Sequence, residues 1–317
     1  MRYPLKLSYI AKSAIWGGTT LSEDWGKLPN GDNIAETWEL SVREKEMATI
    51  ENGKCKGMTL ADYFDKAGYD CVSDTYKKGD RFPLLVKLID AHDRLSVQVH
   101  PDDSYASAVH NDSGKTEMWY VVDAAEGAEL VYGLAEGVDN KGFAKAVADG
   151  KIADAMNFVK VKAGDCFFIP AGMVHAIGGG ILIAEIQQNS DLTYRVYDYN
   201  RVGADGKKRE LHIDRALDVV RPYSDDEVNA IRYFCGYSDD MLANGEYFKV
   251  RKVDVDGKTA LNVRNDSFMS VLCIDGDGSI EYGRESYRIK KGDSYFLPAG
   301  IGDISVNGKL TLICSEI

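Results

Sequence analysis

The sequence predicts a mainly β protein built from two β-barrel or jelly-roll modules with small helical insertions. Three observations predict this class. Short apolar runs that alternate with polar residues recur along the chain, clusters of Gly, Asp and Asn separate them, and one turn–strand–turn segment occurs twice. Helical patterns are few and short, so we expect helices as insertions between strands.

The predicted strands are runs with a period of two or short continuous apolar runs. We expect strands in SVQVH (96–100), MWYVV (118–122), CFFIP (166–170), ILIAEIQ (181–187), LTYRVYDY (192–199), SVLCI (270–274) and SYFLP (294–298). Turn-forming residues bound each of these runs, as is typical of proteins with many short strands.

Three segments carry helical signals. Thr59 is followed three residues later by Asp62, which is the spacing of an N-cap and its reciprocal partner, and predicts a helix that starts after Thr59. The segment 140–158 predicts two short helices broken at Gly150, and 211–220 predicts a third helical region.

The repeat joins two distant parts of the chain. KAGDCFFIPAG at 162–172 matches KKGDSYFLPAG at 290–300, and each copy reads as a Gly-Asp turn, an apolar strand and a Pro-Ala-Gly break. A unit of this kind occurring twice indicates two related β modules. The copies then diverge, because His175 stands three residues after the first copy and Asp303 stands three residues after the second.

Composition and charge exclude several classes of function. The 317 residues carry a formal net charge of -12, which argues against a non-specific nucleic-acid binder or a basic membrane-surface protein. Lys6 and Lys12 interrupt the apolar residues near the N-terminus, so no signal-peptide core is expected there. No run approaches the roughly 20 apolar residues that a membrane-spanning helix needs. The six cysteines are scattered, and we expect reduced thiols in a cytoplasmic protein.

Four polar residues at strand positions predict a metal site. The period of two in 96–100 places Gln98 and His100 on one face of their strand. Glu117 begins the next predicted strand, and His175 begins the strand after the first Pro-Ala-Gly break. Two imidazoles, a carboxylate and an amide oxygen form a mixed nitrogen and oxygen ligand set. The remaining histidines, His92, His110 and His212, have no partner at ligand spacing.

The ligand set leaves the metal open between zinc and iron. Two histidines and one carboxylate also form the ligand set of iron(II) oxygenases. Gln98 would fill a position that such an enzyme needs for oxygen, which favours Zn²⁺ as a redox-inert Lewis acid. The segment after residue 235 contains no histidine and no counterpart of Glu117. We therefore expect a metal-binding module at 1–235, with the helical insertion at 140–158, and a module without metal at 236–317.

Four segments around these residues resemble class I mannose-6-phosphate isomerases of the short bacterial form. They are SVQVHPDD (96–103), GKTEMW (114–119), PAGMVHAI (170–177) and EIQQNSDLTYRVYDYNR (185–201). The resemblance begins at IWGG (15–18), extends to about residue 222 and is weaker beyond. It implies a fold of two cupin modules, one zinc ion per chain and the interconversion of mannose 6-phosphate and fructose 6-phosphate.

The resemblance also implies a set of site residues. Gln98, His100, Glu117 and His175 match the zinc ligands of the family, and Arg195 matches its active-site arginine. Glu185 and Asp191 match the acidic residues before that arginine, Lys115 and Lys87 match two lysines of the site, and Glu36 matches an acidic residue of the pocket. Arg201 stands where longer members carry a lysine, and Ile177 replaces a tyrosine that they often have.

The chemistry of an aldose–ketose isomerase assigns tasks to these residues. It needs a base that moves a proton between two carbons and an electrophile that stabilises the enediolate. Glu185 and Lys87 are the candidate bases, Arg195 is the candidate stabiliser of negative charge, and Asp191 and Glu36 are candidate sugar-binding residues. Lys87, Lys115 and Arg201 are the cations available for phosphate.

Two other functions stay open at the level of the sequence. One is an iron-dependent oxygenase that uses His100, Glu117 and His175, and the other is a non-catalytic phosphosugar-binding protein on the same scaffold. The partner predicted in either the isomerase or the binding protein is a small phosphosugar, with no nucleic acid and no membrane. The sequence does not specify the oligomeric state.

Overall fold

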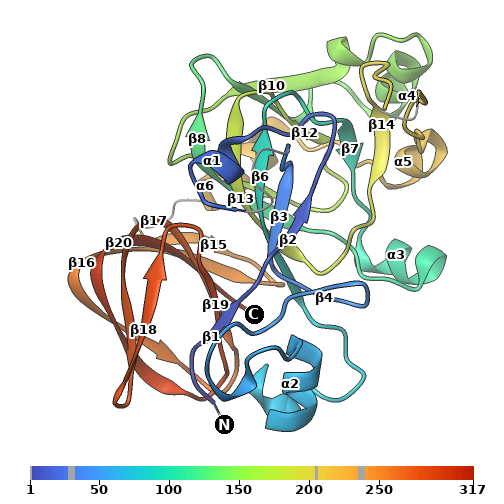
Figure 1. Cartoon of the computed structure of the whole chain (residues 1–317). Helices are drawn as coiled ribbons and strands as arrows, with labels where there is room; N and C mark the ends of the chain where they lie inside the picture. Colours follow the sequence, from blue (N-terminus) through green and yellow to red (C-terminus); the bar gives the residue numbers. More distant parts are fainter. Residues whose placement is uncertain (1, 28–32, 204–205, 235–239) are drawn as a thin grey trace.

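Strands are the main secondary structure of the protein (Figure 1), and the fold class predicted from the sequence is confirmed. The computed structural model describes residues 2–27, 33–203, 206–234 and 240–317. The strands are β1 Leu5–Leu7, β2 Ile10–Lys12, β3 Glu36–Leu40, β4 Val42–Arg43, β5 Glu46–Met47, β6 Leu84–Ala91, β7 Val97–Val99, β8 Glu117–Ala124, β9 Glu129–Leu134, β10 Met156–Lys160, β11 Cys166–Ile169, β12 His175–Ile177, β13 Ile181–Gln188, β14 Tyr194–Tyr197, β15 Met241–Asn244, β16 Lys249–Val263, β17 Met269–Tyr282, β18 Glu285–Lys290, β19 Ser294–Leu297 and β20 Gly302–Glu316. Each of the seven predicted strand segments overlaps one of these strands, and β8, β13 and β17 extend beyond the segments predicted for them.

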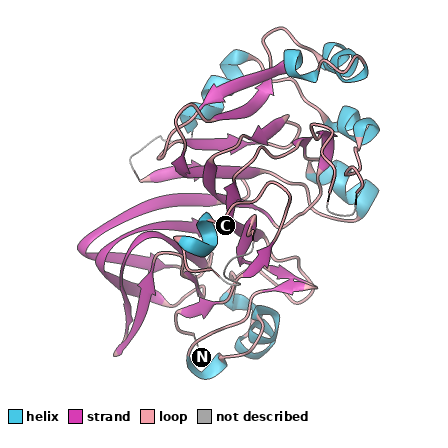
Figure 2. Cartoon of the chain, turned by 45° about the horizontal axis from the view of Figure 1, so that its top comes forward, coloured by secondary structure: helices cyan, strands magenta, loops and turns pink. Residues whose placement is uncertain are grey.

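The helices are short and lie at the margins of the strands (Figure 2). The α-helices are α1 Thr20–Glu23, α2 Leu60–Ala67, α3 Asp103–His110, α4 Asn140–Ala148, α5 Ile213–Val219 and α6 Asp225–Phe234, and the 3₁₀ helices are η1 Gly53–Cys55, η2 Tyr69–Cys71 and η3 Ile152–Ala155. At α2 the predicted capping box is present, because the Thr59 side chain accepts from the backbone of Asp62 and the Asp62 side chain accepts from the backbone of Thr59.

One helical prediction is partly wrong. The segment 140–158 begins with α4 as expected, but η3 is a single 3₁₀ turn and β10 starts at Met156. β10 pairs with β9, with Phe158 opposite Val131. Helical propensity in this segment is overridden by pairing with a neighbouring strand, since tertiary contacts outweigh propensity in short elements.

Two sheets of the first module face each other. The five-stranded sheet has the order β10-β9-β12-β7-β14, and the six-stranded sheet has the order β11-β8-β13-β6-β3-β2. Trp119, Ile183, Tyr132 and Ile177 belong to one buried apolar cluster between them. The strand orders are open, so these sheets pack as a sandwich and close no barrel among the described residues.

The C-terminal strands form a second body that packs on the first. The sheet β1-β19-β17-β20-β16-β15, with β18 beside β17, contains its own apolar cluster. A further cluster joins the outer face of the six-stranded sheet, including Val86 and Ile186, to Phe268, Phe296 and Ile313 of the C-terminal sheet. The second module therefore covers an apolar sheet face that would otherwise meet water.

The N-terminal segment ties the two bodies together. β1 lies beside β19 (Figure 1), with Leu5 opposite Phe296, so the start of the chain is an edge strand of the C-terminal sheet. Lys27 adds a second link, because its buried ammonium lies 2.6 Å from Glu39 and 2.7 Å from the backbone carbonyl of Gly292. The β1–β19 pairing and the contact of Lys27 with Gly292 both join the first forty residues to the last thirty.

The predicted repeat is a repeat of local structure. The aspartate of each Gly-Asp turn accepts a hydrogen bond from the backbone N–H three residues earlier, from Lys162 to Asp165 at 2.9 Å and from Lys290 to Asp293 at 3.1 Å. The strands that follow are β11 and β19. Similar sequences therefore form the same kind of turn and strand in two different sheets.

The cysteines and the lengths of the helices were both the subject of predictions from composition. In the described part of the chain the cysteines at positions 55, 71, 166, 273 and 314 form no disulfide, while Cys235 lies outside the described residues. None of the helices described is both long and apolar enough to cross a lipid bilayer.

Removal of the second module tests its covering role. A chain that ends at residue 240 exposes the apolar face around Val86 and Ile186 and leaves β1 without its partner strand. Exposed apolar faces of this kind aggregate, so we expect the truncated chain in the insoluble fraction while the full chain, expressed in parallel, is soluble. A soluble truncated chain would contradict this account.

Candidate active site

Strand alternation directs the polar side chains of the site into the space between the two sheets. On β7, Val97 and Val99 join an apolar cluster on the outer face of the five-stranded sheet, together with Ala216 of α5. Because successive residues of a strand point to opposite faces, Gln98 points inward. The same alternation on β8 turns Met118 outward and Glu117 inward.

Three buried side chains meet at one point. His175 Nε2 lies 3.1 Å from His100 Nε2 and 3.3 Å from Glu117 Oε1, and His100 Nε2 lies 3.5 Å from Glu117 Oε2. The ligand atoms of the three residues all lie within 4.8 Å of one another. They come from both sheets of the sandwich, and this group could hold a metal ion.

Backbone carbonyls orient both imidazoles for metal binding. His100 donates from Nδ1 to the carbonyl of Leu192 at 2.8 Å, and His175 donates from Nδ1 to the carbonyl of Met173 at 2.8 Å. With Nδ1 protonated, each Nε2 presents its lone pair to the shared point, which is the tautomer that a metal-binding histidine needs. Burial lowers the pKa of both histidines, that of His100 to about 3, so both imidazoles are neutral.

The carboxylate of Glu117 is buried, and its negative charge must be balanced by a nearby cation. Its side chain is completely buried, and neither oxygen accepts a hydrogen bond of normal geometry from the described residues. Lys115 Nζ lies 3.0 Å from Oε2. Burial alone would raise the pKa of Glu117, but the Lys115 ammonium and the neighbouring imidazoles lower it well below the ordinary value, so the carboxylate stays ionised. An ionised buried acceptor between two imidazole nitrogens fits a divalent cation.

Gln98 stands at the edge of this group. Its side-chain nitrogen lies 3.4 Å from His175 Nε2. In the sheet, Gln98 is the register partner of His175 on one neighbouring strand and of Arg195 on the other. A half-turn of the amide exchanges nitrogen and oxygen, so the oxygen can face the shared point. The structure therefore brings all four predicted ligands together.

A cavity of about 130 Å³ adjoins the metal-binding group. It is lined by residues of both sheets and of the segment after β14: Trp16, Glu36, Lys87, Ile89, Leu95, Ser96, Gln98, Lys115, Ile177, Glu185, Thr193, Arg195 and Arg209. Of the predicted catalytic and substrate-binding residues, Lys87, Glu185, Arg195, Lys115 and Glu36 line it. Gln98 reaches both the cavity and the metal-binding group.

Lys87 lies between two carboxylates at the inner end of this cavity. Its Nζ is 3.1 Å from Glu185 Oε2 and 3.6 Å from Glu36 Oε2. Burial would lower the pKa of Lys87, but the two carboxylates raise it above the ordinary value, so its side chain is an ammonium. For Glu36, burial raises the pKa, but the charge of Lys87, the hydrogen bond from Trp38 and the charge of Lys115 together lower it by more, so the net shift is downward.

Two tryptophans orient these carboxylates. Trp119 donates from Nε1 to Glu185 Oε1 at 3.0 Å, and Trp38 donates to Glu36 Oε2 at 2.8 Å. Glu185 Oε2 is buried and accepts no hydrogen bond of normal geometry from the described residues. Burial raises the pKa of Glu185, and Lys87 opposes that rise without cancelling it. Such a carboxylate is a stronger base than one in water.

Arg195 reaches the cavity from β14. Its Nε donates to the Ser96 hydroxyl at 3.2 Å and its Nη1 donates to the carbonyl of Glu210 at 2.9 Å. Burial, and after it the charge of Arg209, lower its pKa, but a guanidinium stays protonated under all ordinary conditions. The cavity therefore holds a permanent cation opposite Gln98.

Two predicted residues lie outside the cavity lining. Asp191 is half exposed and pairs with Arg43 at 2.9 Å. Arg201 pairs with Asp198 at 2.6 Å and packs its guanidinium over the ring of Tyr199. Arg209, which the sequence analysis missed, lines the cavity instead. It follows a turn-rich segment with no periodic pattern, so only its charge and its closeness to the motif strands could have marked it.

Known families match both modules of this chain. The family model "Phosphomannose isomerase type I, catalytic domain" matches residues 5–144, and "Mannose-6-phosphate isomerase, cupin domain" matches residues 239–317. Mannose-6-phosphate isomerase ManA of Bacillus subtilis (strain 168) is 37% identical over 319 residues, with 99% of each chain covered. The chain belongs to the type I phosphomannose isomerase family. The resemblance found in the sequence is thereby confirmed.

Other members of this family match the chain over almost the full length of both sequences. Mannose-6-phosphate isomerase of Streptococcus mutans is 36% identical, covering 100% of this chain and 99% of the relative. The crystal structure of the mannose 6-phosphate isomerase from Bacillus subtilis matches with a TM-score of 0.89 at 35% identity and covers 99% of each chain. The cupin fold of this family member therefore rests on structure as well as on sequence.

The second module of this phosphomannose isomerase family member carries the same strand pairs without the same chemistry. Glu117 pairs across the sheet with Ile169 of the first repeat, and Met269 pairs with Leu297 of the second. At the counterpart of the His175 and Gln98 pair, Asp303 lies opposite Asn262 and accepts a hydrogen bond from it at 2.7 Å. Met269 thus holds the position in the second module that Glu117 holds in the first.

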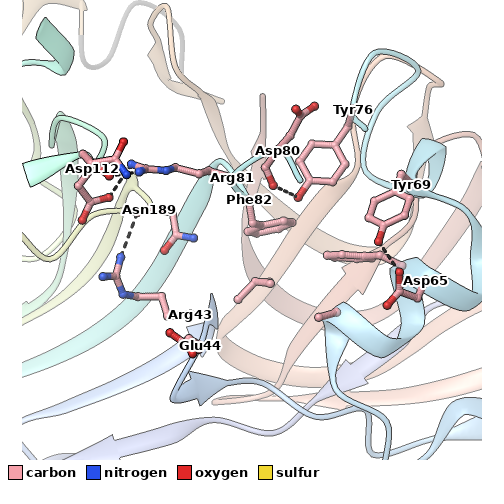
Figure 3. Close-up of a pocket in the computed structure, with 14 residues that line it drawn as sticks. Arg43, Glu44, Asp65, Tyr69, Tyr76, Asp80, Arg81, Phe82, Asp112 and Asn189 are labelled. Atoms are coloured by element: carbon pink, nitrogen blue, oxygen red, sulfur yellow. Dashed lines mark hydrogen bonds and ion pairs between the residues drawn. The ribbon is translucent and has the colours of Figure 1, made fainter. Parts of the chain in front are cut away.

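A larger cavity lies apart from the metal-binding group. It measures about 580 Å³ and is lined by α2, by the β4–β5 hairpin and by the loop that carries Arg81 and Phe82. In Figure 3, Arg81 points to Asp112 and Arg43 points to Asn189. Both arginines already have partners, and the residues that line this cavity include no candidate metal ligand. Its size therefore does not make it the active site of this family member.

Zinc binding tests the group of His100, Glu117 and His175. We expect about one Zn²⁺ per chain by titration calorimetry and elemental analysis. Glu117→Gln keeps the shape but removes the charge, and His175→Ala removes a nitrogen. Either change should weaken binding by more than about 100-fold, the upper end of the loss seen when a supporting contact alone is removed.

His92→Ala is the matched control, because His92 is exposed and lies outside this group. Its zinc affinity should equal that of the unaltered protein. Unchanged zinc affinity in Glu117→Gln and His175→Ala would show that the ion binds elsewhere.

Proposed function

We propose that this chain interconverts mannose 6-phosphate and fructose 6-phosphate with the help of one Zn²⁺ ion. The observation that carries the proposal is the convergence of His100, Glu117 and His175 beside a cavity that holds a buried base and a half-buried arginine. Family membership supports the same reaction, since relatives over the full length are named for it.

In this proposal Gln98, His100, Glu117 and His175 hold the zinc ion. When bound, it would act as a Lewis acid that polarises sugar oxygens. Zinc suits the site better than iron, because an amide ligand takes a position that an oxygenase leaves open for oxygen.

Glu185 is the proton-transferring base in our proposal. Its pKa is raised by burial, and Oε2 accepts no hydrogen bond of normal geometry from the described residues. Lys87 is less suited to this task, because the two carboxylates beside it keep it protonated. A protonated Lys87 can donate a hydrogen bond to a sugar oxygen and stabilise the ionised form of Glu185.

The developing enediolate needs positive charge, which Arg195 supplies in this proposal. Its guanidinium is fixed by Ser96 and by the carbonyl of Glu210, so little reorganisation is needed when charge appears. Lys115 and Glu36 bind substrate beside it. Asp191 and Arg201 are proposed to act from outside the cavity wall, through Arg43 and Asp198 respectively.

The substrate class follows from the charge of the cavity. Four cations line it, Lys87, Lys115, Arg195 and Arg209, against the two carboxylates Glu36 and Glu185. A local excess of positive charge on a chain with a net charge of -12 fits a phosphorylated sugar.

The division of labour between the modules is part of the proposal. Residues 1–235 carry the reaction, and residues 236–317 form a module without metal that braces the six-stranded sheet. Cysteines that form no disulfide in the described part of the chain suit the reducing cytoplasm, in which we propose that the enzyme works.

A coupled assay for fructose 6-phosphate tests the reaction. Protein loaded with zinc should convert mannose 6-phosphate, a strong chelator should abolish the activity, and added Zn²⁺ should restore it. Binding of the sugar phosphate without turnover would favour a binding protein. Oxygen uptake that depends on bound iron would favour an oxygenase, and either result would contradict the proposal.

The pH profile tests Glu185 as the base. A base must be deprotonated, so kcat/KM should fall as the pH drops through the raised pKa of Glu185. Trp119→Phe removes the N–H that favours the ionised form, so the pKa rises further and the acidic limb moves to higher pH.

Trp25→Phe is the control for lost packing, since Trp25 is buried away from the cavity lining. It should leave the acidic limb in place. An acidic limb that stays fixed in Trp119→Phe would remove Glu185 from the role of base.

A further inference from the structure

The four cations of the cavity divide into two kinds. Lys87 is balanced by Glu185 and Glu36, and Lys115 is balanced by Glu117. These lysines therefore belong to the acid–base and metal end of the site.

The two arginines are balanced differently. Arg195 forms no ion pair with any carboxylate in the described part of the chain, and its partners are a hydroxyl and a carbonyl. Arg209 pairs with Asp198 alone, and Asp198 lies behind it, outside the cavity lining. The end of the cavity with the arginines thus carries the unbalanced positive charge.

Asp198 fixes the direction of Arg209. It accepts from Arg209 Nε at 2.8 Å and also from Nη2 of the same guanidinium. This two-point contact uses one edge of the guanidinium, and Nη1 donates to no group among the described residues. A guanidinium held by one edge presents its remaining donors in a fixed plane.

Arg201 in turn fixes Asp198. Its Nη2 donates to Asp198 Oδ1 at 2.6 Å, and its Nη1 donates to the carbonyl of Arg94. Asp198 is 5% exposed. Although burial raises the pKa of Asp198, hydrogen bonds from Arg209 and Arg201 lower it more, so the anchor stays ionised.

Arg195 and Arg209 are close enough to repel each other, since the charge of Arg209 disfavours the protonated form of Arg195. Both line the same cavity, and no carboxylate of the cavity lining pairs with either. Two fixed guanidinium groups facing one space form a binding site for a dianion.

We propose that Arg209 binds the phosphate group of the substrate beside Arg195, and that Asp198 and Arg201 position Arg209 for this contact. The inference rests on the proposed function. Arg209 is then the residue that makes the enzyme prefer a phosphorylated sugar, while Arg201 acts through the anchor and does not touch the substrate.

Steady-state kinetics with Arg209→Gln tests this role. A lost hydrogen bond between two charged groups should raise KM for mannose 6-phosphate about 10- to 100-fold with a much smaller change in kcat. Inorganic phosphate, as a competitive inhibitor, should weaken by a similar factor. Arg195→Ala should instead lose mainly kcat, because Arg195 acts on the developing charge.

Conservative variants separate binding from folding. Arg209→Lys keeps a positive charge and should give an intermediate KM, since an ammonium lacks the two-point geometry. Asp198→Asn leaves Arg209 charged but removes its ionic anchor, so KM should rise while kcat is retained. Bound zinc and the thermal unfolding midpoint should match the unaltered enzyme in each variant that is compared.

The control is Arg264→Gln, which breaks an exposed arginine–aspartate pair of the second module. It should leave KM and phosphate inhibition unchanged. If the unaltered enzyme converts mannose 6-phosphate while Arg209→Gln, with normal zinc content, keeps its KM and its phosphate inhibition, the inference is overturned. If the unaltered enzyme fails to convert the sugar phosphate at all, the proposed function itself has failed.

Discussion

The ionised carboxylate of Glu117 is the constraint around which the first module is organised. It is completely buried, and among the described residues the cation that offsets its charge is Lys115. Removing such a group from water costs several kcal/mol, and the cost is repaid only where cations are held at close range. Both sheets of the sandwich contribute to this arrangement, so the metal-binding group depends on their packing and not on any single segment.

The second module has the same strand framework without a buried carboxylate at the position of Glu117. Its turn–strand–turn segment has the same hydrogen bonds as the first copy, and Asn262 and Asp303 face each other where Gln98 and His175 do in the first. With Met269 in the place of the carboxylate, no buried charge has to be offset. The strand framework is therefore separable from the chemistry, in agreement with the general rule that function resides in sites placed on folds.

Much of the site could be predicted because a strand has a fixed period. The alternation in 96–100 placed Gln98 and His100 on one face, and the repeat located His175 after its break, so three candidate ligands followed from local pattern alone. Residues that act from irregular segments were harder to predict. Arg209 reaches the cavity through its contact with Asp198, while Arg201, which the family pattern favoured, turns to Asp93 and the carbonyl of Arg94. The strand β10 was missed since pairing with β9 decided its conformation.

The pairing of β1 with β19 has a consequence for biosynthesis. About 290 residues separate Leu5 from its partner Phe296 in the sequence. At roughly 5–20 residues per second, β1 waits about 15 to 60 s before the strand that satisfies its backbone is synthesised. The C-terminal sheet is therefore completed long after β1 has been synthesised, and the nascent chain must keep β1 from pairing with a neighbour on the same messenger.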